Sequence, residues 1–300
     1  MKTCLILKRD FGQLGNRLHT HANVLAFALE HDLDLLNLSF SGQTKHFARH
    51  DGQPADRHFQ HSPLLRTLLQ FPKILALFQR LALSDRHLAR FGSILFTLER
   101  NDDEALHEAE LGHVLRLFPR PRFILLRTWD LRCPKALEKH APAIRQRLSP
   151  AKHTRDAVAH LHAKLPPHDL LVGLHARRGD YATWQKGLHF HSWQQYADWL
   201  RQTHALLLQA GHQPAYLLCS DESPPPGTFT PLPIAAEQRH LMTDLNALST
   251  CNLLLGPPSS FGSWAAFYGE VPRLCLQRNT PLVSLPSARD PMLNSGVKIK

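Results

Sequence analysis

Charge is scarce in this 300-residue chain, since charged residues make up 20% of it while 43% of the residues are hydrophobic. A chain with this balance can bury a core, which excludes intrinsic disorder, and its 15 glycines are too few for a collagen-like repeat. No apolar run approaches the roughly 20 residues that cross a bilayer. The apolar run near the N-terminus is too short for a secretory signal. We therefore expect a soluble, cytoplasmic protein.

Cysteines are few, odd in number and never spaced as CxxC, which disfavours both a disulfide framework and a zinc ribbon. We expect them to be buried as small hydrophobic residues: Cys4, Cys133, Cys219, Cys251 and Cys275. The histidine pairs His160/His162 and His189/His191 lack a carboxylate or cysteine at ligand spacing. The sequence therefore predicts no metal site.

Acidic residues are fewer than basic ones, 25 against 35, and the formal net charge of +10 favours an anionic partner. Nucleic acid is not expected, because no basic run with interleaved aromatics and no recognition motif is present. An anionic glycolipid or membrane surface fits better, so we expect peripheral binding at the inner membrane face. The basic residues that suggest it include Arg116, Arg120, Arg122 and Arg127.

The first half of the chain begins with a strand, a glycine turn and a helix. Apolar residues 3–8 precede the turn, helical spacing follows from Leu18 to Leu29, and residues 33–38 predict the next strand. Short connections of this kind favour parallel strands. The remaining expectations are a loop at 41–62, helical patterns over 63–100, a strand at 123–126, and helices at 135–148 and 153–165.

Pro166-Pro167 is the predicted domain boundary, which gives domains of residues 1–166 and 167–300. Beyond it, strands and helices alternate as in a doubly wound α/β domain. We expect strands at 170–174, 215–218, 253–255 and 273–276, with helices at 193–208, 241–248 and 262–268. The whole suggests two Rossmann-like domains that face each other across a cleft.

The most informative motif is the segment 171–181, LVGLHARRGDY. It is an apolar strand that ends in His175, Arg177, Arg178 and Asp180, and ligands of open α/β sheets bind beyond such carboxyl ends. Guanidinium forks match the oxygens of a diphosphate. The plainer alternative is a surface salt bridge between Arg177 and Asp180. An RGD adhesion motif is a weaker alternative, because three residues recur by chance.

Three further motifs carry polar groups at element ends. In GPPSSFGSW, residues 256–264, Ser259 and Ser260 are natural helix N-caps, and free N–H groups of that turn would bind an anion. Ordinary capping, with Gly262 as a packing contact, is the alternative. GQLGN, residues 12–16, opens a helix that Asn16 would cap unless it contacts a ligand. Asp244 near a helix start would otherwise only complement the helix dipole.

Taken together and in this order, these motifs resemble the GDP-fucose-dependent fucosyltransferases. With Cys219-Ser220-Asp221 between them, they are similar to the α1,2-, α1,6- and protein O-fucosyltransferase-related families, in a bacterial-type member. The resemblance implies a GT-B-like fold and metal-independent, inverting transfer of fucose to a glycan, glycolipid or protein hydroxyl. It implies no cofactor beyond the donor substrate GDP-fucose, which the second domain would bind while the first serves the acceptor.

The resemblance also implies roles for single residues. His175 would lie near the nucleoside, and Arg177 would bind the β-phosphate with Arg178 beside it. Asp180 would lie near the reacting sugar or brace the arginines, so Arg177 and Asp180 are the expected catalytic residues. Asp244 matches the acid that recognises the guanine edge. The other expected donor-binding residues are Gly15, Asn16, Asp221, Ser259, Ser260 and Phe261.

The chain departs from the family pattern at two places. A single Trp264, followed by two alanines, stands where many relatives have a Trp-Trp pair. Thr183, Trp184 and Gln185 stand where some relatives carry an acid, which leaves the general base unassigned. These departures keep open an alternative function, a catalytically degenerate protein of the same fold that binds nucleotide sugars.

Overall fold

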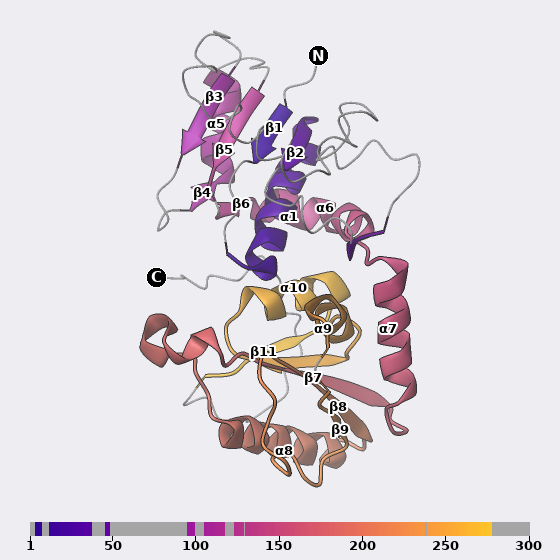
Figure 1. Ribbon diagram of the computed structural model, residues 1–300. Coiled ribbons are helices and arrows are strands. Elements are labelled where there is room, and N and C mark those ends of the chain that lie inside the picture. The colour runs from indigo at the N-terminus through magenta and orange to yellow at the C-terminus, as the bar shows by residue number, and fades with distance from the viewer. Residues whose placement is uncertain are drawn as a thin grey trace. The chain divides into compact units, whose positions relative to one another are not determined.

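The computed structural model describes residues 4–7, 12–37, 46–48, 95–99, 105–117, 123–128, 130–237 and 239–277. The chain divides into two compact units, Met1–Ala151 and Lys152–Ile299, which are coloured from indigo to yellow along the sequence in Figure 1. This division falls before helix α7 (Lys152–Ala163), whereas the sequence suggested Pro166-Pro167. The reason is that α7 packs against α9 (Leu241–Leu248) of the second unit.

A β-α-β segment opens the first unit, as the sequence predicted. It consists of β1 (Cys4–Leu7), α1 (Leu14–Glu30) and β2 (Asp34–Asn37). β1 and β2 are parallel, and β5 (Phe123–Arg127) and β3 (Leu95–Glu99) complete a parallel sheet in the order β2-β1-β5-β3. The interpretation of 63–100 as helical is wrong for β3, because a short apolar run fits a buried strand as well as a helix.

Helix α1 is the buried centre of the first unit. Twelve of its residues are buried, and α6 (Pro134–Arg147) packs along it. The sequence did not predict the small parallel pair β4 (Leu106–His107) and β6 (Leu131–Arg132), or helix α5 (Glu108–Leu117). Of the predicted loop 41–62, only 46–48 belong to the described residues. Of the four basic residues, Arg120 and Arg122 lie outside them.

The second unit is a parallel sheet in the order β11-β10-β7-β8-β9. Its strands are β7 (Leu170–Ala176), β8 (Pro214–Ser220), β9 (Ile234–Ala235), β10 (Leu253–Gly256) and β11 (Arg273–Cys275). Helix α8 (Trp193–Gln209) lies on one face of this sheet, while α9 and α10 (Ser260–Gly269) lie on the other (Figure 1). The α/β alternation predicted from the sequence is confirmed, and α9 has the predicted bounds.

Burial on the α8 face holds this unit together. Tyr196 and Leu200 of α8 are fully buried and pack with Tyr216 and Val172 of the sheet. Ser192 starts the helix in a capping box, accepting from the backbone of Gln195 while the Gln195 side chain accepts from Ser192.

Within the described ranges, no helix combines the length and apolar character needed to cross a membrane.

The strand order reverses at β7, which places a ligand crevice at its carboxyl end. The chain proceeds from β7 outward to β8 and β9, and then returns to add β10 and β11 on the opposite side of β7. Open α/β sheets bind ligands at such a reversal. Gly256 at the end of β10 allows the backbones of β10 and β7 to approach closely at this point, because a Cβ there would lie 2.7 Å from the His175 carbonyl oxygen.

Candidate nucleotide-sugar site

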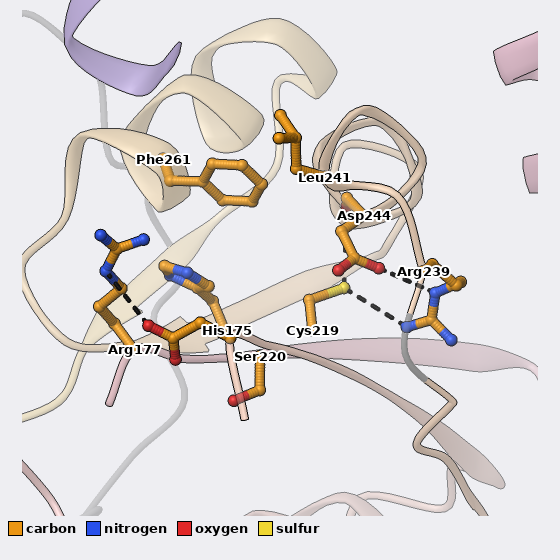
Figure 2. Close-up of a pocket in the computed structure, with 9 residues that line it drawn as sticks. His175, Arg177, Cys219, Ser220, Arg239, Leu241, Asp244 and Phe261 are labelled. Carbon is orange, nitrogen blue, oxygen red and sulfur yellow. Dashed lines mark hydrogen bonds and ion pairs between the residues drawn. The ribbon is translucent and has the colours of Figure 1, made fainter. Parts of the chain in front are cut away.

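A cavity of about 250 Å³ lies where the strand order predicts a crevice. The ends of β7 and β8 and the starts of α9 and α10 form its walls, and Figure 2 draws the side chains. Its lining residues are His175, Arg177, Cys219, Ser220, Asp221, Arg239, Leu241, Asp244 and Phe261. Five of the residues predicted to bind the donor therefore line one cavity: His175, Arg177, Asp221, Asp244 and Phe261.

His175 and Phe261 form an aromatic wall in the middle of the cavity (Figure 2). Their rings stack with centroids 5.1 Å apart, and His175 is only 7% exposed. Burial, with the nearby charges of Arg273 and Arg177, lowers the pKa of His175 to about 3. The imidazole is therefore neutral at physiological pH, so the wall offers aromatic contact and single hydrogen bonds rather than charge.

Arg177 and Asp180 form a two-point ion pair at one end of the cavity. Arg177 Nε lies 2.7 Å from Asp180 Oδ1, and Nη2 lies 2.8 Å from Oδ2. The pairing given as the plainer alternative is thus present, yet Arg177 also lines the cavity. Its hydrogen bonds to Arg177 lower the pKa of Asp180, which makes Asp180 a weak proton acceptor and a brace for the guanidinium.

Asp221 shapes the turn that carries both arginines. Its carboxylate accepts the backbone N–H groups of Arg178 at 2.9 Å and Gly179 at 3.1 Å. It also lies 3.6 Å from Arg177 Nε. The acid after β8 therefore fixes the course of the chain after β7 and adds negative charge beside Arg177.

Arg178 is not among the residues that line the cavity, and its contact with the donor stays a prediction. Its guanidinium lies between the rings of Phe190 and Trp193, at 4.7 and 4.8 Å from their centroids. It also donates to Glu222 Oε2 at 2.8 Å and to the His191 carbonyl oxygen at 2.7 Å. The second arginine of the pair is thus held by protein groups, because aromatic faces and an acid already satisfy it.

Asp244 stands at the other end of the cavity and is paired with Arg239. Arg239 Nε donates to Asp244 Oδ1 at 2.8 Å, and Arg239 Nη2 donates to the Leu218 carbonyl oxygen at 2.6 Å. Burial raises the pKa of Asp244, an effect that Arg239 opposes. Arg239 was not identified from the sequence, because it precedes α9 in a segment without periodicity. A cation five residues before an acid near a helix start could have indicated the ion pair.

The serine turn uses its own first amides. Ser259 is the N-cap of α10, and its Oγ accepts from the backbone N–H groups of Phe261 at 3.1 Å and Gly262 at 3.2 Å. Ordinary capping is therefore what the structure shows, and Ser259 and Ser260 are not among the lining residues. Ser259 Oγ nevertheless lies 3.5 Å from His175 Nδ1, so the turn borders the cavity.

Arg273 supports this turn from below and was also missed by sequence reasoning. It is 7% exposed and donates to the Pro257 carbonyl oxygen at 2.6 Å and to Ser263 Oγ at 2.8 Å. Gly262 makes room for it, since a Cβ there would lie 3.1 Å from Arg273 Nε. The packing contact expected at Gly262 is therefore with a buried cation.

Gly15 and Asn16 lie in the first turn of α1, in the first unit. Gln13 occupies the N-cap position, so Asn16 does not cap the helix as one alternative held. The contact of this turn with the donor stays a prediction. Among the described residues, no group of three or more His, Cys, Asp or Glu side chains is arranged to hold a metal ion.

The fold is similar to that of solved fucosyltransferases. A FUT1 variant from Arabidopsis thaliana, in complex with GDP, shares 14% identity and superposes with a TM-score of 0.58, covering 93% of this chain and 72% of its own. NodZ from Bradyrhizobium, an α1,6-fucosyltransferase soaked with GDP-fucose, shares 15% identity and superposes with a TM-score of 0.51, covering 93% of this chain and 97% of its own. POFUT1 in complex with GDP-fucose shares 13% identity and superposes with a TM-score of 0.52, covering 90% of this chain and 95% of its own.

No family model matches the chain, and no curated protein matches it in sequence. At identities of this size the similarity establishes the fold. The class defined here is thus an α/β protein with the fucosyltransferase fold and a polar cavity at the strand reversal of its second unit.

Proposed function

We propose that this chain is a fucosyltransferase that uses GDP-fucose as its donor. The observation that carries the proposal is the order of groups along one cavity. Asp244 lies at one end and Arg177 at the other, with the stacked rings of His175 and Phe261 between them (Figure 2). These groups follow the order of the parts of the donor. The acid would bind the N–H edge of guanine, the aromatic wall would contact the nucleoside, and the cation would bind the diphosphate.

The reaction needs a stabilised leaving group. The acceptor hydroxyl oxygen forms a bond to the anomeric carbon of fucose, and the bond from that carbon to the phosphate oxygen breaks. Its electron pair leaves with GDP, so negative charge grows on the β-phosphate. Arg177, held in place by Asp180, stabilises that charge where it develops. The hydroxyl proton passes to Asp180, a histidine or solvent. The ion pair of Asp180 with Arg177 makes Asp180 the less favourable acceptor of this proton.

We further propose inversion at the anomeric carbon, no metal ion and no cofactor. A GT-B-like arrangement, two Rossmann-like domains facing across a cleft, would let the first serve the acceptor and the second the donor. What supports this division is that each unit has its own parallel sheet and that the cavity is lined from the second. The proposed acceptor is a hydroxyl of a glycan, glycolipid or protein, and the proposed location is cytoplasmic, at an anionic membrane surface.

Thermal unfolding in the presence of nucleotides tests the donor. GDP-fucose and GDP should raise the melting temperature, since a ligand at a hundredfold excess over its Kd stabilises by about 2.7 kcal/mol. UDP-sugars should not, because uracil lacks the adjacent N–H donors that Asp244 accepts. Arg177→Met should remove most of the shift. A shift of equal size in Arg177→Met, or with UDP-glucose, would contradict the proposal.

A second function is a nucleotide-sugar-binding protein without catalysis. It is favoured by one observation, that Thr183, Trp184 and Gln185 follow the arginine segment where some relatives carry an acid. Both functions predict the thermal shift with GDP-fucose. Release of free GDP in the presence of a glycan panel separates them, because only the transferase produces it faster than a protein-free control.

A further inference from the structure

An aromatic cluster follows the arginine segment, and none of its members is among the residues that line the cavity. It consists of Tyr181, Trp184 and His189. The Tyr181 and Trp184 rings stack with centroids 4.9 Å apart and an interplanar angle of 26°, and the His189 ring lies 5.6 Å from Trp184. Tyr181 is buried, whereas Trp184 and His189 are partly exposed. The cluster therefore contains a ring that stacks on a buried neighbour and is itself partly exposed.

The backbone that presents this cluster is strained. Gln185, Lys186 and Gly187 have φ angles of 47°, 57° and 71°, so two non-glycine residues lie in the left-handed region in succession. Hydrogen bonds hold the segment in this form, from Lys186 N–H to the Thr183 carbonyl at 3.1 Å and from Phe190 N–H to the Gly187 carbonyl at 3.1 Å. Strain of this kind persists where surrounding structure fixes it, and it concentrates at binding sites.

The cluster adjoins the Arg177 end of the cavity through Tyr181. The Arg177 guanidinium carbon is 5.8 Å from the centroid of the Tyr181 ring, and the Tyr181 hydroxyl donates to the Pro258 carbonyl oxygen at 2.6 Å. Because Asp244 stands at the opposite end, a donor bound in the proposed direction points its sugar toward Arg177 (Figure 2). The groups beyond Arg177 are then those that an acceptor meets first.

We propose, on the basis of the proposed function, that Trp184 is the stacking platform for a sugar ring of the acceptor. A pyranose has a face of C–H groups that packs on an aromatic ring, while its hydroxyls point to the rim. Burial lowers the pKa of His189, so its imidazole is neutral and offers one donor and one acceptor to such a hydroxyl. Leu188, in the same segment, is 58% exposed and adds apolar surface to it. The acceptor class is thus a glycan bound through a pyranose face.

Saturation-transfer NMR with defined sugars tests the platform. The probes are lactose, N-acetylglucosamine and methyl β-galactoside, each with and without GDP. The variants are Trp184→Ala, Trp184→Phe and a control, Leu208→Ala, at an exposed position of α8. For at least one sugar, Trp184→Ala should weaken binding about threefold to tenfold. Trp184→Phe should restore most of the affinity, and Leu208→Ala should leave it unchanged. The thermal shift with GDP should be the same in all four proteins, which shows that each is folded.

Two outcomes overturn the platform. One is equal sugar binding by the wild type and Trp184→Ala, and the other is a wild type that binds GDP but none of the three sugars. Failure of the proposed donor is a separate result, because it appears as a missing GDP shift in the wild type. The measurements without GDP report sugar binding in either case.

Discussion

Arg239 and Asp244 form a buried ion pair at one end of the cavity, with side chains that are 10% and 11% exposed. The guanidinium also holds the Leu218 carbonyl at the end of β8, so the pair ties the start of α9 to the sheet. One partner without the other is a buried, uncompensated charge. This makes the pair a determinant of the stability of the second unit and of the charge at this end of the cavity.

Arg239→Met should therefore destabilise the protein by roughly 3 kcal/mol, because the carboxylate of Asp244 is left buried without its cation. Urea unfolding at pH 7 measures the change. Arg201→Met is the matched control, since Arg201 pairs with Asp198 on the surface at 40% and 50% exposure and should cost less than about 1 kcal/mol. Equal losses in the two variants would mean that burial of the Arg239 pair has no energetic consequence.

Guanosine affinity should fall as the pH is lowered. Under the proposed function the base would donate N–H groups to an ionised Asp244, and burial raises the pKa of this carboxyl above that of an exposed aspartate. Binding is therefore complete well above that pKa and is lost as the pH falls through it, at a higher pH than an exposed aspartate, near 3.9, would give.

Guanosine is the probe for this titration because it has no phosphates that titrate in the same range. His175, with its pKa near 3, stays neutral throughout. Calorimetry between pH 8 and pH 4 gives the profile, and Asp244→Asn is the control. A profile of the same shape in Asp244→Asn would assign the pH dependence to other groups.

Arg177 and Asp180 should differ in their effect on transfer. Under the proposed function, Arg177→Met should lower kcat by about 10²–10³, since it would remove the cation at the leaving phosphate. Asp180→Asn should lower kcat far less and leave the pH profile of kcat in place, because under the proposed function Asp180 would orient Arg177 rather than accept the proton. Loss of the basic limb of that profile in Asp180→Asn would instead identify Asp180 as the general base.

Gly256→Ala should damage both the sheet and the cavity. The new Cβ would lie 2.7 Å from the His175 carbonyl oxygen, so β10 must shift from β7, at a cost of about 1–3 kcal/mol. Nucleotide affinity should fall in parallel. Gly112→Ala in α5 is the control, because space is available there and alanine favours a helix by roughly 1 kcal/mol. An unchanged melting temperature in Gly256→Ala would show that the strands tolerate the added methyl group.

Local pattern predicted the α/β alternation and the polar residues His175 and Arg177 beyond a strand end, where ligands of open α/β sheets bind. Asp221 and Asp244 were expected at the same site only through the resemblance to the fucosyltransferases. Pattern could not tell which polar groups are satisfied by protein. Arg178 is held between Phe190 and Trp193, and the first amides of α10 are taken by Ser259, and both facts depend on side-chain positions.

Long-range partners were likewise beyond the sequence. Arg239 pairs with Asp244 from a segment without periodic apolar residues. Arg273 of β11 donates to Ser263 and supports the serine turn, which follows β10. The strand β3 was mistaken for part of a helix, since an apolar run of five residues has the same composition in either form.

Every residue that lines the cavity belongs to the unit Lys152–Ile299. Under the proposed function, the cavity residues that would select the nucleotide therefore all lie in one half of the polypeptide. Under the proposed function, descendants of this protein can diversify residues 1–151 toward new hydroxyls while inheriting an unaltered means of reading the donor.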